Sequence, residues 1–88
     1  MIRRDFTIVN RLGLHARAAA QLVQAANKFV AEVTLYKEDI EVNGKSIMGI
    51  LLLAAPKGTL ISIAVDGSDE EQAMNNLAEL IEDGFGED

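Results

Sequence analysis

The only histidine of the chain, His15, stands directly before an alanine-rich run. Histidine is the side chain whose unperturbed charge change falls near neutral pH. The alanine-rich run predicts a helix with His15 at its N-cap, where unpaired backbone N–H groups and the helix dipole favour an anion. Arg17, two residues further on, adds a planar cation suited to phosphate. We interpret His15 as a phosphoryl acceptor; the competing interpretation is a histidine that only caps the helix or hydrogen-bonds a neighbour.

Two neighbours of His15 favour the phosphoryl interpretation. Gly13 permits an unusual backbone conformation just before the ring. Arg17 falls in the first helical turn, where a cation opposes the dipole by up to about 1 kcal/mol, so an anion that visits this turn would explain it. The N–H groups of Ala16 and Arg17, together with the Arg17 side chain, are expected to stabilise a phosphate on His15.

A second helix start lies at Ser46, which is predicted to cap a short helix. A phosphate at a helix N-terminus is electrostatically favourable, so Ser46 is also a candidate phosphorylation site. The helix after it is rich in apolar residues, namely Ile47, Met48, Ile50 and Leu51. Part of this surface is a candidate docking patch. The alternative is that these residues are core, an interpretation that suits Ile50 and Leu51 better than Ile47 and Met48.

Composition excludes several classes of site. The 88 residues contain no cysteine, which removes disulfides and thiol chemistry, and one histidine is too few for a structural zinc site. A net charge of −6 argues against general nucleic-acid binding. The basic residues all lie at or before Lys57, whereas the segment after it carries nine acids. No apolar run is long enough to span a bilayer, and a chain this short offers no shelter for a Ser-His-Asp hydrolase site. A cytoplasmic protein without a cofactor is expected.

Alternating and helical apolar spacing predicts seven elements in the order strand, helix, strand, strand, helix, strand, helix. The expected ranges are residues 2–9, 16–27 or 28, 29–36, 40–42, 47–53, 59–66 and a last helix that ends near residue 83. Val30 is a candidate extension of the apolar stripe on the first helix, and Ser68 with Glu71 is predicted to form a capping box for the last. Two helical crossovers and one hairpin predict a single α+β domain over residues 1–88, with one sheet covered on one face by helices.

Taken together, four short motifs resemble the HPr family, the histidine-containing phosphocarriers of the bacterial phosphoenolpyruvate-dependent sugar phosphotransferase system. The motifs are Gly13-Leu14-His15-Ala16-Arg17, Asn43-Gly44-Lys45-Ser46-Ile47-Met48-Gly49-Ile50, Lys57-Gly58-Thr59 and Asp66-Gly67. Each motif is weak alone, but their order and separation are specific. The resemblance covers nearly the whole chain and implies an open-faced sandwich of a four-stranded antiparallel sheet and three helices.

The resemblance also implies roles for individual residues. His15 would take a phosphoryl group, on the ring nitrogen nearer the backbone, from phosphorylated enzyme I and pass it to the A component of a sugar-specific enzyme II. Arg17 would assist, and Ser46 would be the regulatory position used by an ATP-dependent HPr kinase/phosphorylase. Ile47 and Met48 would belong to the docking surface, to which we add Leu51. Such a chain is a carrier rather than an enzyme, and we expect a monomer.

One position departs from the family pattern: HPr proteins usually have proline directly after the active-site arginine, and this chain has Ala18. Alanine keeps the helix but restores one backbone donor and loosens the helix start slightly. The departure bears on the transfer rate rather than on the chemistry. A nitrogen-branch or mainly regulatory HPr paralogue stays open as an alternative, as does a non-catalytic interaction module.

Overall fold

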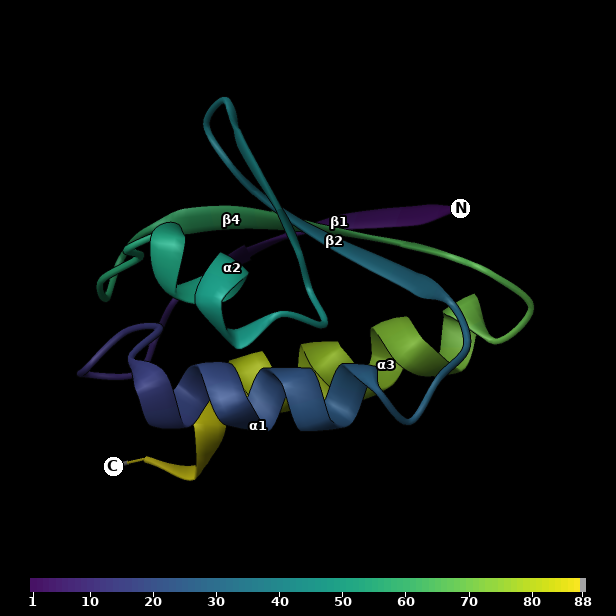
Figure 1. Cartoon of the computed structure of the whole chain (residues 1–88). Helices are drawn as coiled ribbons and strands as arrows, with labels where there is room; N and C mark the ends of the chain where they lie inside the picture. Colours follow the sequence, from purple (N-terminus) through teal and green to yellow (C-terminus); the bar gives the residue numbers. More distant parts are fainter. Residues whose placement is uncertain (88) are drawn as a thin grey trace.

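A computed structural model describes residues 1–87 of the chain. Within these residues the elements follow the predicted order βαββαβα, and a short 3₁₀ helix, η1, comes after them (Figure 1). Their bounds are β1 Ile2–Thr7, α1 Ala16–Ala26, β2 Glu32–Lys37, β3 Ile40–Asn43, α2 Ile47–Leu52, β4 Leu60–Asp66, α3 Glu70–Glu82 and η1 Gly84–Gly86. No helix in this part of the chain is long and apolar enough to cross a membrane.

The four strands form one antiparallel sheet with the spatial order β1-β4-β2-β3. Strands β2 and β3 form the predicted hairpin, and β4 lies between β1 and β2, so that Val65 is opposite Ile2 on one side and Val33 on the other. Helices α1, α2 and α3 all lie on the same face of the sheet (Figure 1). The predicted open-faced α+β sandwich is therefore confirmed.

The core lies between this face of the sheet and the helices. Alternate residues of each inner strand point into it, as a half-buried sheet requires. The fully buried larger side chains are Ile8, Leu22, Leu35, Ile50, Leu53, Ile61, Ile63, Val65, Met74, Leu77 and Ile81. Four alanines of α1 are nearly or completely buried as well, which lets this helix pack closely against its neighbours.

Asp69 explains two differences from the sequence prediction. Its carboxylate accepts hydrogen bonds from the Val30 and Ala31 N–H groups, at 2.9 and 3.0 Å. Those N–H groups are therefore not used in the sheet, and β2 begins at Glu32 rather than near residue 29. Val30 is 76% exposed, so its predicted place in the apolar stripe was wrong.

The predicted capping box at the start of α3 was also wrong. The N-cap residue is Asp69, and its side chain makes no bond to the helix because it serves the segment before β2. Glu70, not Glu71, reaches back, and its Oε1 accepts from the Gly67 N–H at 3.1 Å. Strand β1 likewise ends at Thr7 rather than at residue 9, although Ile8 still exchanges backbone hydrogen bonds with Gly58 and Thr59.

Candidate functional site

His15 is the N-cap of α1, as predicted, and the loop before it is hydrogen-bonded to the backbone of Ala55. The Leu14 N–H donates to the Ala55 carbonyl at 2.9 Å. Gly13 has a φ of +67°, and a Cβ atom there would lie 2.4 Å from the same Ala55 oxygen. Only glycine satisfies both conditions without a shift of the backbone. The loop therefore delivers His15 to the helix start in a defined position.

The first turn of α1 leaves its N–H groups without partners inside the helix. The first helical hydrogen bond runs from the Ala19 N–H to the His15 carbonyl, at 2.8 Å. The His15 side chain makes no capping bond, and the turn contains no acidic residue. Unpaired N–H groups and the positive end of the dipole thus meet beside the ring, an arrangement that favours a bound anion.

Ala18 lies in this first turn and is completely buried. The first hydrogen bond within the helix is made by the Ala19 N–H, so the Ala18 N–H has no partner inside the helix. Alanine therefore fits the position sterically and leaves a donor where proline would have none.

A residue that sequence reasoning missed, Glu87, contacts the His15 ring. Glu87 Oε2 is hydrogen-bonded to His15 Nε2 although the two residues are 72 positions apart in the sequence. The Asn10 side-chain N–H donates to the same carboxylate oxygen at 3.3 Å and to the Gly13 carbonyl at 2.7 Å. The hydrogen bond from His15, with a smaller contribution from Asn10, lowers the pKa of Glu87, while partial burial opposes this.

The sequence contained one indication that the segment around Glu87 packs on the domain. Phe85, an aromatic residue between two glycines, lies beyond the last predicted helix. Phe85 is only 3% exposed. An apolar side chain buried this close to Glu87 shows that the segment is packed on the domain. Sequence analysis assigned no role to it.

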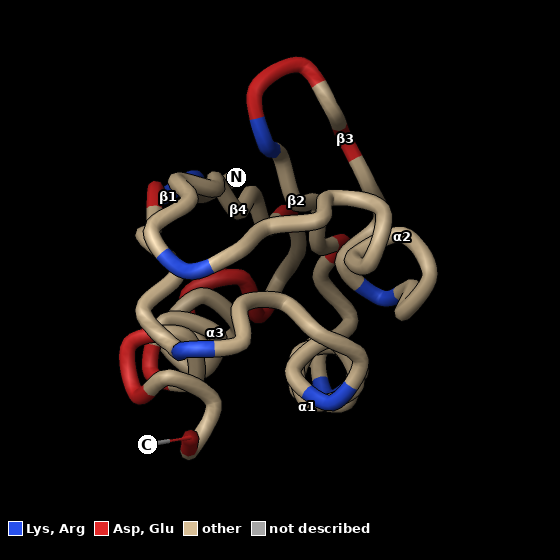
Figure 2. The backbone as a smooth tube through the Cα atoms, turned by 90° about the vertical axis from the view of Figure 1, so that its left-hand side faces the viewer, with Lys and Arg blue, Asp and Glu red and all other residues tan. Residues whose placement is uncertain are grey.

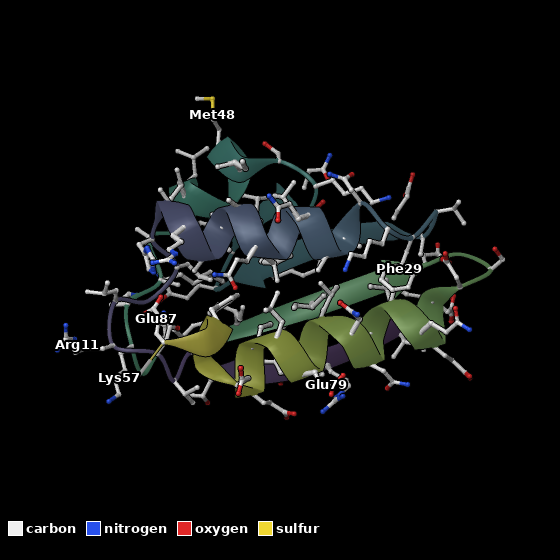
Figure 3. All side chains as sticks on the ribbon, turned by 90° about the horizontal axis from the view of Figure 1, so that it is seen from below. Arg11, Phe29, Met48, Lys57, Glu79 and Glu87 are labelled. Atoms are coloured by element: carbon white, nitrogen blue, oxygen red, sulfur yellow. The ribbon has the colours of Figure 1, made fainter. Side chains whose placement is uncertain are left out.

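Arg17 lies on the exposed face of α1, beside a cleft of about 350 Å³. The cleft is lined by Arg11, Leu12, Arg17, Gln21, Phe85, Gly86 and Glu87. Arg11, Lys57 and Glu87 lie at the same end of the molecule (Figure 3). Figure 2 is turned so that this end faces the viewer, and it shows acidic segments along α3, at the tip of the β2–β3 hairpin and near the C-terminus, with basic segments between them. The cleft thus places the cations Arg11 and Arg17 beside the carboxylate that contacts His15.

A second hollow, of about 290 Å³, has His15 in its lining. It is lined by Leu12, Leu14, His15, Ala54, Ala55 and Pro56. Ala54 has a φ of +48°, a left-handed conformation that is uncommon for residues other than glycine. His15 therefore borders a largely apolar hollow, while its hydrogen-bond partner Glu87 lines the charged cleft.

Ser46 is the N-cap of α2, as predicted, and its Oγ accepts a hydrogen bond from the Gly49 N–H at 3.0 Å. Beyond it, Ile50 is buried, whereas Ile47, Met48 and Leu51 are 42%, 77% and 39% exposed. Leu51 is thus nearly as accessible as Ile47, which rules out the alternative that it is core; its place in the docking surface stays a prediction. Leu52, which was not predicted to be part of the patch, is 71% exposed and extends it.

Met48 projects away from the rest of the fold (Figure 3). In the described part of the chain, no group of three or more His, Asp or Glu side chains is arranged to hold a metal ion.

Comparison with known proteins identifies the family. The model for the PTS HPr component phosphorylation site matches residues 2–83. The chain belongs to the HPr family. The phosphocarrier protein HPr of Xylella fastidiosa is 52% identical over 88 residues, which cover 100% of this chain and 99% of that protein. HPr of Neisseria meningitidis is 51% identical over 99% of this chain and 98% of its own length.

A solved HPr structure has the same fold. HPr-C-His from Thermoanaerobacter tengcongensis superimposes with a TM-score of 0.96 at 43% identity, covering 100% of this chain and 99% of the other. The general role of the HPr family, that of a phosphocarrier in the phosphotransferase system, therefore applies to this chain.

Proposed function

We propose that this chain carries a phosphoryl group on Nδ1 of His15, the ring nitrogen nearer the backbone. The observation that carries the proposal is the position of His15 at the N-terminus of α1, beside N–H groups that have no partner inside the helix. Those of Ala16 and Arg17 are the donors we assign to the phosphate, and the exposed Arg17 guanidinium adds charge-assisted contacts. These contacts stabilise the phosphorylated form without enclosing it, which suits a group that must be passed on.

In the proposed step, the lone pair of Nδ1 forms a bond to phosphorus. The bond between phosphorus and the donor breaks, and its electron pair stays with the donor. In onward transfer the P–N bond on His15 breaks, its electron pair returns to Nδ1, and a new bond forms between phosphorus and the acceptor, so the protein acts as a carrier rather than as an enzyme. We assign this role to residues 1–88 as one domain, which works as a cytoplasmic monomer without a cofactor.

The proposed donor is phosphorylated enzyme I, and the proposed acceptor is the A component of a sugar-specific enzyme II. Both would dock on the apolar surface formed by Ile47, Met48 and Leu51. These side chains are partly or largely exposed on α2, so a partner could bury them on docking.

The test is incubation of the purified chain with enzyme I and labelled phosphoenolpyruvate. We expect an acid-labile phosphate on the wild-type protein and none on His15→Ala. Ser46→Ala is the control, because it leaves the histidine in place and should keep the acid-labile label. Wild-type protein that stays unmodified in this mixture would contradict the carrier role and favour a non-catalytic interaction module.

A second candidate function rests on Ser46. Its Oγ accepts from the Gly49 N–H at the start of α2, so a phosphate there would meet helix N–H groups and would not need to unfold the helix. We propose Ser46 as a regulatory site for an HPr kinase/phosphorylase. With that kinase and ATP, an acid-stable phosphate should form on the wild type and be absent from Ser46→Ala. Acid-stable label on another residue would refute this assignment, whereas a protein labelled only at Ser46 would favour a mainly regulatory paralogue.

A further inference from the structure

The contact between Glu87 and His15 joins the end of the described chain to the start of α1. Glu87 Oε2 is hydrogen-bonded to His15 Nε2, and their side chains are 19% and 25% exposed. No other protein hydrogen bond to the His15 ring is found within residues 1–87. Nδ1, the nitrogen proposed to take the phosphoryl group, is therefore left without a protein partner in the part of the chain described.

Two contacts hold the segment that carries Glu87: the buried side chain of Phe85 and a hydrogen bond from Asn10. Phe85 is buried in the core, and it has a φ of +56°, a conformation that a bulky residue adopts only when its surroundings impose it. Asn10, itself 3% exposed, donates from Nδ2 both to Glu87 and to the Gly13 carbonyl. The same amide thus ties the carboxylate to the loop that delivers His15.

An ionised carboxylate accepts hydrogen bonds and cannot donate them. The hydrogen bonds from His15 and Asn10 lower the pKa of Glu87, so the carboxyl group is ionised at neutral pH. The proton of the Glu87–His15 hydrogen bond must then lie on Nε2. In a neutral imidazole, a proton on Nε2 leaves Nδ1 with its lone pair free.

We propose that Glu87 is a positioning residue, which holds His15 in the Nε2–H tautomer and so makes Nδ1 the nucleophile. The inference rests on the proposed role of His15. When Nδ1 bonds to phosphorus and the donor bond breaks, positive charge spreads over the ring while Nε2 keeps its proton. The Glu87 carboxylate faces that proton and stabilises the charge, much as the acid of a Ser-His-Asp triad orients and supports its histidine.

The first test measures the tautomer directly, by the ring ¹⁵N chemical shifts of His15 in the unphosphorylated protein near pH 8. The wild type should show the Nε2–H form predominantly. Glu87→Gln replaces the carboxylate with an amide that can donate as well as accept, so both tautomers should be populated. Glu79→Gln is the matched control, because Glu79 is an exposed glutamate on α3, and Figure 3 places it away from Glu87. A wild-type ring with the proton on Nδ1, or the same shifts in Glu87→Gln as in the wild type, would overturn the proposal.

The second test measures the rate of phosphoryl transfer from enzyme I. Glu87→Gln should slow the transfer roughly tenfold, as expected for the loss of one charge-assisted hydrogen bond in the transition state. Glu87→Asp, which keeps the charge on a shorter side chain, should recover part of the rate, and Glu79→Gln should match the wild type. An unchanged or faster rate in Glu87→Gln would overturn the proposal and would identify Glu87 as an obstacle at the site.

The two proposals fail in different ways. If the wild type and Glu79→Gln both accept phosphate on His15 while Glu87→Gln behaves identically, the carrier role stands and the role of Glu87 falls. If the wild type accepts no phosphate, the carrier role falls and the function of Glu87 in transfer falls with it, whatever the tautomer.

Discussion

Helices α1 and α2 both begin without an acidic residue in the first turn, but their N-cap side chains bind different partners. Neither has an acidic residue in its first turn, whereas α3 has Glu70 and Glu71 there. At α2 the N-cap side chain of Ser46 accepts from the helix's own Gly49 N–H. At α1 the N-cap side chain of His15 makes no such bond, and its ring is hydrogen-bonded to Glu87 instead.

The difference separates two uses of a helix N-terminus. The start of α2 is stabilised by a contact within the helix itself, so the hydroxyl of Ser46 contributes to the stability of the folded protein. The start of α1 keeps its N–H groups unpaired within the helix, and the cap residue is held in place by a segment from the other end of the chain. Changes to the contacts of the N-cap residue should therefore act mainly on transfer at α1 and mainly on stability at α2.

The largest effect is expected from Phe85→Ala, which releases the segment that contacts α1. Removal of a buried phenyl ring should lower the free energy of unfolding by about 3 kcal/mol, the lower end of the usual range, since a segment near the chain end can relax into the space. Because Glu87 would lose its anchor, the rate of transfer should fall as well. Urea denaturation and transfer kinetics under native conditions measure the two effects.

Met74→Ala is the matched control for Phe85→Ala. Met74 is 2% exposed on α3, and its truncation should cost a similar free energy of unfolding. It should leave the rate of transfer unchanged, since Met74 lies within α3 and takes no part in the hydrogen bonds that join Asn10, His15 and Glu87. Equal transfer rates in the two variants would show that the segment with Phe85 and Glu87 does not position His15 for transfer.

A smaller effect is expected from Ser46→Ala, which removes the cap of α2. Loss of the bond to the Gly49 N–H should lower the free energy of unfolding by about 1 kcal/mol. The rate at which His15 accepts phosphate should stay the same. Ser46→Thr keeps a capping hydroxyl and should retain most of the stability in the same denaturation experiment. A slowed transfer in both variants would mean that the two helix starts are not independent.

The features that could be predicted from the sequence are those set by neighbouring residues. The alternation in β4, the cap at Ser46 and the glycine before His15 each depend on a few adjacent positions, and the element order followed from them. The contacts of Asp69 with Val30 and Ala31, and of Glu87 with His15, join residues 38 to 72 positions apart. No local pattern distinguishes a carboxylate that makes such a contact from one that is solvated. Sequence reasoning therefore placed His15 correctly at a helix start and missed the residue that orients it.

Arg17→Gln is expected to have the smallest effect on stability. It is also the clearest test of the difference between the starts of α1 and α2. Arg17 is an exposed cation in the first turn of α1, where the positive end of the helix dipole disfavours it. Its removal should raise the free energy of unfolding by roughly 0.3 to 1 kcal/mol at low ionic strength, and less in high salt. Transfer should nevertheless slow, because the guanidinium is proposed to contact the phosphate.

Lys28→Gln serves as the control at the opposite end of the same helix. Lys28 follows the C-cap residue Asn27, where a cation suits the negative end of the dipole, so its loss should destabilise the protein slightly and leave transfer unchanged. The opposite signs of the two stability changes would show that Arg17 is kept at a cost to folding. If Arg17→Gln lowered stability or transferred phosphate at the wild-type rate, the start of α1 would be an ordinary capped helix like the start of α2.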